Sequence, residues 1–317
     1  MELNIRTICH SNLLKDLPSR TEDVLARRFG LRGGRQTLEE IGAEYGITRE
    51  RVRQIQDDGL RILKQRAESP ECQKVFKVFA KTLKNSGSLK REDVLLTDLG
   101  KGQENFVYLL LTISKQFQRF GETEDFHTFW ATDKNAFENA KKAINSFITE
   151  LQKKQQPMAL PRTVLASYAD ISKKVLKGQE GLYGLKEWPE INPRGIKDKA
   201  FIVLKKEQKP LHFSEVATLI GNGALRQTVH NELIKDQRFV LVGRGLYALK
   251  EWGYEPGIVR EVIANILKEA KKPLEKEMVV DKVLTQRLVK PNTILLNLQN
   301  KKYFLKTSEG KYTVREV

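Results

Sequence analysis

Hydrophobic side chains recur every three to four residues along most of this chain, which predicts a mainly helical protein. The clearest stretch runs from Thr37 to Leu63, TLEEIGAEYGITRERVRQIQDDGLRIL, and it predicts two helices joined by a tight turn. The residues expected to face inward are Leu38, Ile41 and Tyr45 in the first helix, and Val52, Ile55, Gly59 and Ile62 in the second.

Polar and glycine residues around these two stripes indicate where each helix begins and ends. Thr37 and Glu40 have the T-x-x-E spacing of a capping box, and Thr48 is expected to cap the second helix. Gly46 can supply the left-handed backbone of the turn. Gly42 lacks a side chain where the second helix has to pass closely. The segment is therefore expected to fold as a helix-turn-helix.

The outward side of the second helix is rich in Arg and Gln near its N-terminal end. The residues on or beside this face are Arg49, Glu50, Arg51, Arg53, Gln54 and Asp57. In helix-turn-helix proteins this end reaches base edges in the major groove, where Arg suits guanine, Gln suits adenine and Glu accepts from cytosine. An ordinary amphipathic helix with a solvated charged face is the alternative. The glycines and caps, together with this face, favour DNA reading.

A further helix is predicted upstream, within LPSRTEDVLARRFG, after a leading segment of 16 residues. Ser19 or Thr21 is expected to cap this helix, and Gly30 to end it. The stretch Arg32-Gly-Gly-Arg35 then reads as a flexible basic loop.

Residues 17–65 as a whole resemble region 4 of bacterial sigma factors, with TLEEIG and TRERVRQI as the specific part. The resemblance implies recognition of a promoter −35 element and docking on the β flap of RNA polymerase. It implies base reading by Arg49, Glu50, Arg51, Arg53 and Gln54, and backbone contacts from Arg20, Thr37 and Lys64. Only 16 residues precede Leu17 and none is Trp, Tyr or Phe, so we do not expect promoter melting in the usual sigma manner.

The next part of the chain, residues 69–134, has the expected order helix, helix, helix and two strands, which is typical of a winged helix. Its stretch KQFQRFGETEDFHTFWAT alternates with period two around a GETE turn. The aromatic side chains there could stack on nucleic-acid bases, but the core of a small sheet is the favoured interpretation. Residues 135–155 predict an amphipathic helix with Phe137, Ala140, Ile144, Phe147 and Leu151 inward.

Internal repeats indicate tandem modules in the C-terminal half. GLYGLKEW at residues 181–188 recurs as GLYALKEW at 245–252, and Lys-Pro-Leu at 209–211 recurs at 272–274. A weaker echo, GKYTV, follows at residues 310–314. Each copy is expected to hold a long helix, a Lys-Pro-Leu hinge, one or two short helices and an aromatic hairpin. Residues 194–252 resemble the HARE helix-turn-helix family, which includes the delta subunit of RNA polymerase.

The predicted architecture is mainly α with small β wings: a sigma region 4-like helix-turn-helix followed by tandem winged-helix modules. The expected domains are residues 1–68 (helix-turn-helix), 69–134 (winged-helix-like), 135–192 (truncated winged-helix-like), 193–253 (HARE-like winged helix) and 254–317 (divergent winged helix).

Charge supports a polyanionic partner, since the 317 residues carry a net charge of +16 with a pI near 9.6. Residues 1–68 hold 13 Lys and Arg against 11 Asp and Glu, a net +2, which leaves +14 on the remaining residues. The winged modules are thus the main source of positive charge, either for phosphate contacts or for solubility. No apolar run is long enough for a membrane span and no secretory signal is evident, so we expect a cytoplasmic protein without a membrane partner.

No catalytic chemistry is indicated by the sequence. It has no nucleotide-binding loop, no G-x-S-x-G motif and no CxxC or HExxH spacing, and Cys9 and Cys72 are isolated thiols. We therefore expect no cofactor, no metal and no enzymatic activity. The expected function is a sequence-specific DNA-binding transcription regulator or sigma-like factor that binds double-stranded DNA, together with RNA polymerase. The alternative is a polymerase-associated subunit whose winged modules bind proteins or non-specific DNA. The oligomeric state is left open.

Overall fold

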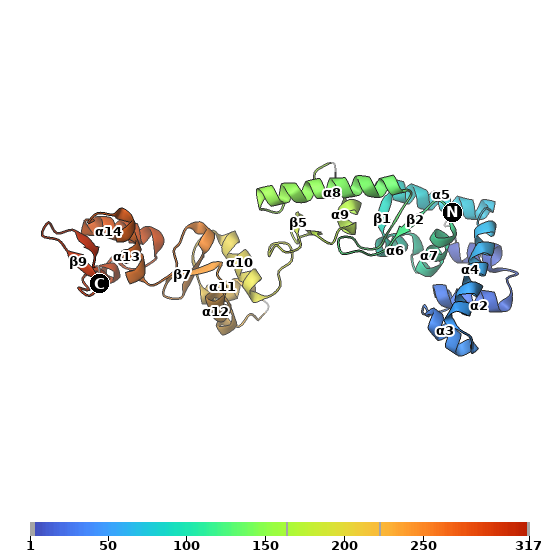
Figure 1. Ribbon diagram of the computed structural model, residues 1–317, viewed down its shortest axis with the longest axis horizontal. Helices are drawn as coiled ribbons and strands as arrows, with labels where there is room; N and C mark the ends of the chain where they lie inside the picture. The colour runs from blue at the N-terminus through green and yellow to red at the C-terminus, as the bar shows by residue number, and fades with distance from the viewer. Residues whose placement is uncertain (1–3, 163, 222, 316–317) are drawn as a thin grey trace. The chain divides into compact units, whose positions relative to one another are not determined.

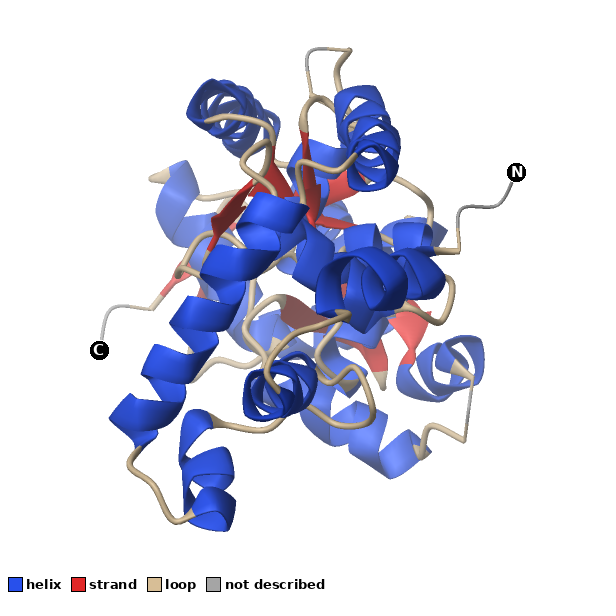
Figure 2. Cartoon of the chain, turned by 90° about the vertical axis from the view of Figure 1, so that its right-hand side faces the viewer, coloured by secondary structure: helices blue, strands red, loops and turns tan. Residues whose placement is uncertain are grey.

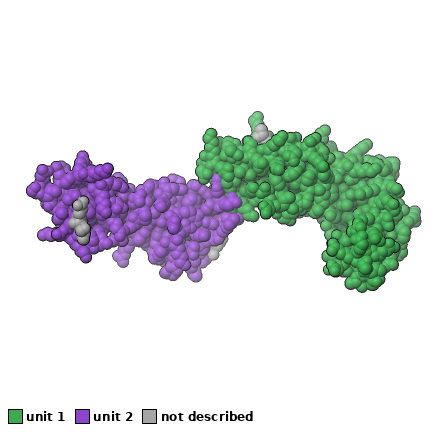
Figure 3. All heavy atoms as spheres, in the orientation of Figure 1, with its two compact units in different colours: residues 1–186 green, residues 187–317 purple. Residues whose placement is uncertain are grey.

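The computed structural model describes residues 4–162, 164–221 and 223–315 and divides into two compact units, residues 1–186 and 187–317 (Figure 3). Helices dominate and the strands are short, as Figure 2 shows. The paired strands are antiparallel. The expected mainly helical class with small sheets is confirmed. Among the described residues, no helix is long and apolar enough to cross a membrane.

Unit 1 begins with five helical segments. They are α1 (Ile5–Ile8), the π-helix η1 (Cys9–Leu14), α2 (Ser19–Phe29), α3 (Leu38–Tyr45) and α4 (Arg49–Arg66). The leading segment is part of the folded core, because Cys9 and Leu13 are fully buried. The predicted cap of α2 is wrong. The helix follows Pro18 without a side-chain cap, and Ser19 is already its first residue.

The second half of unit 1 starts with a winged-helix arrangement. Its elements are α5 (Pro70–Asn85), β1 (Leu89–Arg91), α6 (Glu92–Gly100), α7 (Glu104–Ile113), β2 (Gln118–Phe120) and β3 (Phe129–Ala131). The sheet order is β1-β3-β2. The sequence predicted β2 and β3 but not β1, because Leu89-Lys-Arg91 shows no alternation of apolar and polar residues. Phe117, Phe129 and Trp130 are buried, so the aromatic residues form a core rather than a stacking surface.

One hydrophobic core joins the helix-turn-helix to this second half. It runs from Ile5 to Trp130 and includes Leu25 and Leu63 from one side of residue 68, and Phe106 and Leu110 from the other. Helix α7 packs against α1, α2 and α4. The core therefore crosses the domain boundary expected after residue 68. The division into five domains stays a prediction.

Unit 1 ends with a shorter version of the same arrangement. It comprises α8 (Lys134–Lys154), α9 (Ala166–Ile171), β4 (Val175–Lys177) and β5 (Tyr183–Leu185). Figure 1 shows α8 as the long helix of this unit. The predicted inward face of α8 is confirmed by the burial of Ala140, Ile144, Phe147 and Leu151, with Phe137 half-buried.

Unit 2 contains two more winged-helix arrangements, each with its own core. The first comprises α10 (Ile196–Glu207), β6 (Leu211–His212), α11 (Phe213–Ile220), α12 (Arg226–Lys235), β7 (Phe239–Gly243), β8 (Leu246–Leu249) and the short 3-10 helix η2 (Lys250–Trp252). The second comprises α13 (Val259–Ala270), α14 (Lys276–Gln286), α15 (Pro291–Leu298), β9 (Phe304–Lys306) and β10 (Tyr312–Val314).

The sequence repeat corresponds to one repeated backbone pairing. Tyr247 pairs with Leu211 in the sheet, and Tyr312 forms the equivalent bridge with Leu274. Tyr183 does the same with Met158 in the truncated copy. The Lys-Pro-Leu stretch was expected to be a hinge. In both modules of unit 2, its Leu instead pairs with the strand that contains the repeated tyrosine.

A buried arginine ties the two modules of unit 2 together. Arg287 is 3% exposed, and its guanidinium donates to the backbone carbonyl oxygens of Leu241, Glu255 (2.7 Å) and Gly257. Burial lowers the pKa of Arg287. The next residue strengthens the junction, because the Leu288 amide donates to Val242 O at 2.9 Å.

Candidate nucleic-acid interface

The turn between α3 and α4 fixes where α4 begins. Gly46 has a φ of +63°, which L side chains rarely adopt, and the Thr48 hydroxyl accepts from the Arg51 amide at 3.2 Å. A Cβ added at Gly42 would lie 2.7 Å from Ile47 O. The predicted roles of these residues are therefore confirmed. The close approach, however, is to the turn that leads into α4 rather than to the body of that helix.

The start of α3 is fixed by the predicted capping box. The Thr37 hydroxyl accepts from the Glu40 amide at 3.2 Å, and the Glu40 carboxylate accepts from the Thr37 amide at 2.6 Å. The hydrogen bonds from Thr37 lower the pKa of Glu40. A small core of Val24, Ile41 and Val52 then holds α2, α3 and α4 together.

All five predicted base-reading residues lie on the first two turns of α4 and are exposed. They are Arg49, Glu50, Arg51, Arg53 and Gln54. Their anchor is the opposite side of the helix, where Val52 is fully buried. The structure thus presents this set as one solvent-facing surface at the N-terminal end of α4, which is the end that reaches base edges in helix-turn-helix proteins.

Ion pairs and a hydrogen bond order this surface. Arg53 donates to both carboxylate oxygens of Glu50 (2.9 and 2.6 Å) and to Asp57 (2.6 Å), while Arg51 donates to the Gln54 side-chain oxygen at 3.0 Å. The hydrogen bond from Arg53 lowers the pKa of Glu50, and the bond to Glu50 raises the pKa of Arg53. DNA would have to exchange these contacts for contacts with bases or phosphates.

The three residues predicted to contact the DNA backbone are not brought together. Arg20 is exposed, and its guanidinium carbon lies 4.9 Å from the centre of the Tyr45 ring, near the end of α3. Thr37 uses its hydroxyl as a helix cap. Lys64 lies 15 residues after Arg49, roughly 22 Å further along α4.

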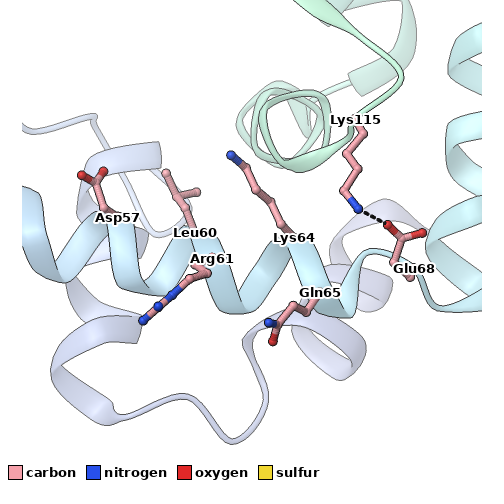
Figure 4. Close-up of a pocket in the computed structure, with 7 residues that line it drawn as sticks. All are labelled: Asp57, Leu60, Arg61, Lys64, Gln65, Glu68 and Lys115. Carbon is pink, nitrogen blue, oxygen red and sulfur yellow. Dashed lines mark hydrogen bonds and ion pairs between the residues drawn. The ribbon is translucent and has the colours of Figure 1, made fainter.

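Lys64 lines a surface hollow of about 620 Å³ on the C-terminal half of α4 (Figure 4). The lining residues are Asp57, Leu60, Arg61, Lys64, Gln65, Glu68 and Lys115. Lys115 donates to Glu68 at 3.0 Å. This mixture of charges is open to solvent, and it adjoins the base-reading surface at Asp57, the partner of Arg53.

Several residues that support the site were missed by the sequence reasoning. The Tyr45 hydroxyl donates to Asp23 at 2.7 Å, and Arg27 bonds both Asp23 (2.5 Å) and Glu44, which ties α3 to α2. Burial raises the pKa of Asp23, but the bonds from Tyr45 and Arg27 outweigh it and lower the pKa overall. Ordinary charged residues on two separate helices give no sequence signal of such pairing. Among the described residues, no group of three or more His, Cys, Asp or Glu could hold a metal ion.

Two helices joined by a glycine turn, with an exposed Arg- and Gln-rich face on the second, define a DNA-binding helix-turn-helix domain. Residues 13–65 match the model of the family described as Sigma-70, region 4. The N-terminal part of this chain is a sigma-70 region 4 helix-turn-helix.

Curated relatives match over a stretch of similar length. The RNA polymerase sigma factor SigA of Listeria monocytogenes and that of Listeria innocua are each 48% identical over 61 residues. The match covers 19% of this chain and 16% of each relative. The similarity is therefore one of a domain rather than of a whole protein.

Proposed function

We propose that this protein is a sequence-specific DNA-binding transcription regulator or sigma-like factor that recognises a −35-like promoter element. The observation that carries the proposal is the exposed set Arg49, Glu50, Arg51, Arg53 and Gln54 at the N-terminal end of α4, within a region 4 fold. Double-stranded DNA is the proposed ligand, and the protein acts in the cytoplasm with RNA polymerase.

The packing of this chain limits which of its surfaces could contact RNA polymerase. Leu25, Phe29 and Leu63 form the apolar side of α2 and α4, and all three are buried in the core that α7 shares. A contact with the β flap would therefore use exposed surface of region 4, or it would have to displace α7.

A second function, a polymerase-associated subunit with winged modules that bind proteins, is favoured by the third helices of two of these modules. Helix α7 is buried in unit 1, so it cannot enter a DNA groove. Helix α15 carries no charged residue, and its Leu296 is 70% exposed. A helix without a cation suits a protein contact better than a phosphate backbone. The element order of residues 194–252 supports the HARE-like assignment, which stays a prediction.

Phosphate contacts by the C-terminal modules are part of the first proposal. Their charge includes the pairs 205–206, 271–272 and 301–302, although Lys205 already donates to Glu190 at 2.6 Å. Each phosphate contact adds to the salt dependence of DNA binding. Deletion of residues 194–317 should then flatten the salt dependence, and an unchanged slope would mean that these lysines serve solubility.

Selection of random DNA sequences by the full chain tests the two functions against each other. An enriched motif that is lost in Arg51→Ala and Gln54→Ala supports the first. No enriched motif, together with tight binding to purified RNA polymerase, supports the second. We also propose that the protein is not an enzyme and uses no cofactor. A plasmid-cleavage assay with added divalent metal checks this point, and metal-dependent nicking would overturn it.

A further inference from the structure

Helix α5 carries a stripe of four lysines outside the region that matches the sigma family. The residues are Lys74, Lys77, Lys81 and Lys84, and all four are exposed. Their spacing of three, four and three residues places them on one side of the helix. At 1.5 Å per residue, the stripe is about 15 Å long. We call this set the α5 lysine stripe.

The direction of the stripe is fixed by the opposite side of α5. Val75, Phe76, Phe79 and Leu83 are at most 1% exposed and belong to the core that also holds α4 and α7. The helix therefore cannot rotate to hide its lysines without breaking that core. Only the flexible ends of the four side chains are free to adjust.

The stripe lacks the ion pairs that balance charge on other helices of the chain. Within the described residues, none of its four lysines donates to a carboxylate, whereas α4 alternates Glu50, Arg53 and Asp57 in two close pairs. Like charges three or four residues apart destabilise a helix. Helix α5 thus keeps a locally unfavourable arrangement of charge, which an anionic ligand along the stripe would relieve.

The spacing of the stripe suits a nucleic-acid backbone. One strand of B-DNA places a phosphate every 3.4 Å or so along the helix axis, so a length of about 15 Å spans the rise of roughly four phosphates. We propose that the α5 lysine stripe binds the phosphate backbone of DNA without regard to sequence. Val78, 44% exposed, is the large apolar side chain beside the stripe. A single such residue is too little for an apolar protein contact.

This site is distinct from the base-reading surface. Residues 46–48 connect α3 to the N-terminal end of α4, and residues 67–69 connect the C-terminal end of α4 to α5. The start of α5 therefore lies the length of α4, about 26 Å, from the base-reading end of that helix. The stripe would engage either a bent continuation of the DNA held by α4 or a second duplex.

The test is the salt dependence of binding by the full chain to a random-sequence duplex of about 40 base pairs, which does not require α4 to recognise a motif. The variant changes Lys74, Lys77, Lys81 and Lys84 to Gln. Loss of four phosphate contacts should reduce the slope of log K against log salt by about 3.6. Between about 50 and 200 mM salt, the wild type should then lose roughly 150-fold more affinity than the variant.

The matched control removes the same charge from α8 by changing Lys134, Lys141, Lys142 and Lys153 to Gln. These lysines are also exposed in unit 1. The proposal predicts little change in slope for the control. An equal loss in both variants, or no loss in the stripe variant, would overturn it. The proposal would also be overturned if the stripe variant lost binding to an acidic protein partner while its salt slope for DNA stayed unchanged. Thermal unfolding of both variants verifies that they remain folded.

Two further measurements identify the source of the phosphates. In the first, the protein is held on an immobilised duplex and a labelled duplex is added. Recruitment of the labelled duplex that depends on the stripe would show that the stripe binds a second DNA molecule. Stripe-dependent shortening of the end-to-end distance of one long duplex assigns a bend. The outcome of the DNA selection experiment for α4 is independent of this test. If the selection yields no enriched motif, the salt slope on random-sequence DNA still reports on the stripe.

Discussion

Replacing Gly42 with Ala tests whether the α3–α4 turn sets the position of the base-reading helix. The added Cβ would lie 2.7 Å from Ile47 O, while ordinary contacts of this kind begin at 3.4 Å. The turn must therefore open by about 0.7 Å. The obstacle is a backbone carbonyl, so no side-chain rotation can relieve it.

Two opposing effects decide the magnitude. Overpacking of this kind destabilises by up to about 3 kcal/mol, whereas Ala stabilises a helix interior by about 1 kcal/mol relative to Gly. The net destabilisation of the helix-turn-helix is then up to about 2 kcal/mol. Because the small core of Val24, Ile41 and Val52 is separate from the main core, we expect local opening rather than global unfolding.

Amide hydrogen exchange measures this local opening directly. A destabilisation of about 2 kcal/mol should accelerate exchange in α3 and the first turns of α4 roughly 30-fold. Exchange in α5 and α7 should be unchanged. Gly33→Ala is the matched control, because a Cβ there meets no atom within 4 Å. Equal exchange in the two variants, or slower exchange in Gly42→Ala, would refute the reasoning.

Three other changes probe different parts of the chain. Gln54→Ala should weaken binding at the selected DNA site by about 1–3 kcal/mol in a titration, and an equal loss on all sequences would mark a phosphate contact instead. Tyr45→Phe removes the bond to Asp23 and should cost about 1 kcal/mol in denaturant unfolding at neutral pH. Because the pKa of Asp23 is lowered from 3.8, the stability contributed by its ionised form is complete above that pH and is lost as the pH falls below it. Arg287→Met leaves three carbonyl oxygens without their donor and should lower the free energy of unfolding of unit 2 by about 1–3 kcal/mol. An unchanged melting temperature would show that the junction contributes little to stability.

The features of the site that the sequence predicted are formed by interactions between residues only a few positions apart in the chain. The capping box of Thr37 and Glu40, the turn at Gly46 and the cap at Thr48 are all local, so their residue types carry the information. The exposed face of α4 follows in the same way from a period of 3.6 residues. Its assignment to region 4 rested on resemblance and is confirmed by the family match.

The sequence predicted only part of the strand pairing inside each module. The repeated Gly-Leu-Tyr sequence predicted a hairpin, but its partner strand lies 36 residues earlier in the case of Leu211 and Tyr247. A two-residue strand has no periodic pattern. Its existence depends on an antiparallel neighbour that only the folded chain supplies.

The sequence alone determined the helix-turn-helix, because helix caps, turn glycines and an amphipathic stripe act over one or two turns of backbone. Only the tertiary structure decided what that element is attached to. Burial of Phe106 and Leu110 against Leu25 and Leu63 turns the third helix of the next module into a support for α2 and α4. The physical reason is that apolar residues predict burial but do not specify their partner. The partner is chosen by packing between segments far apart in the chain.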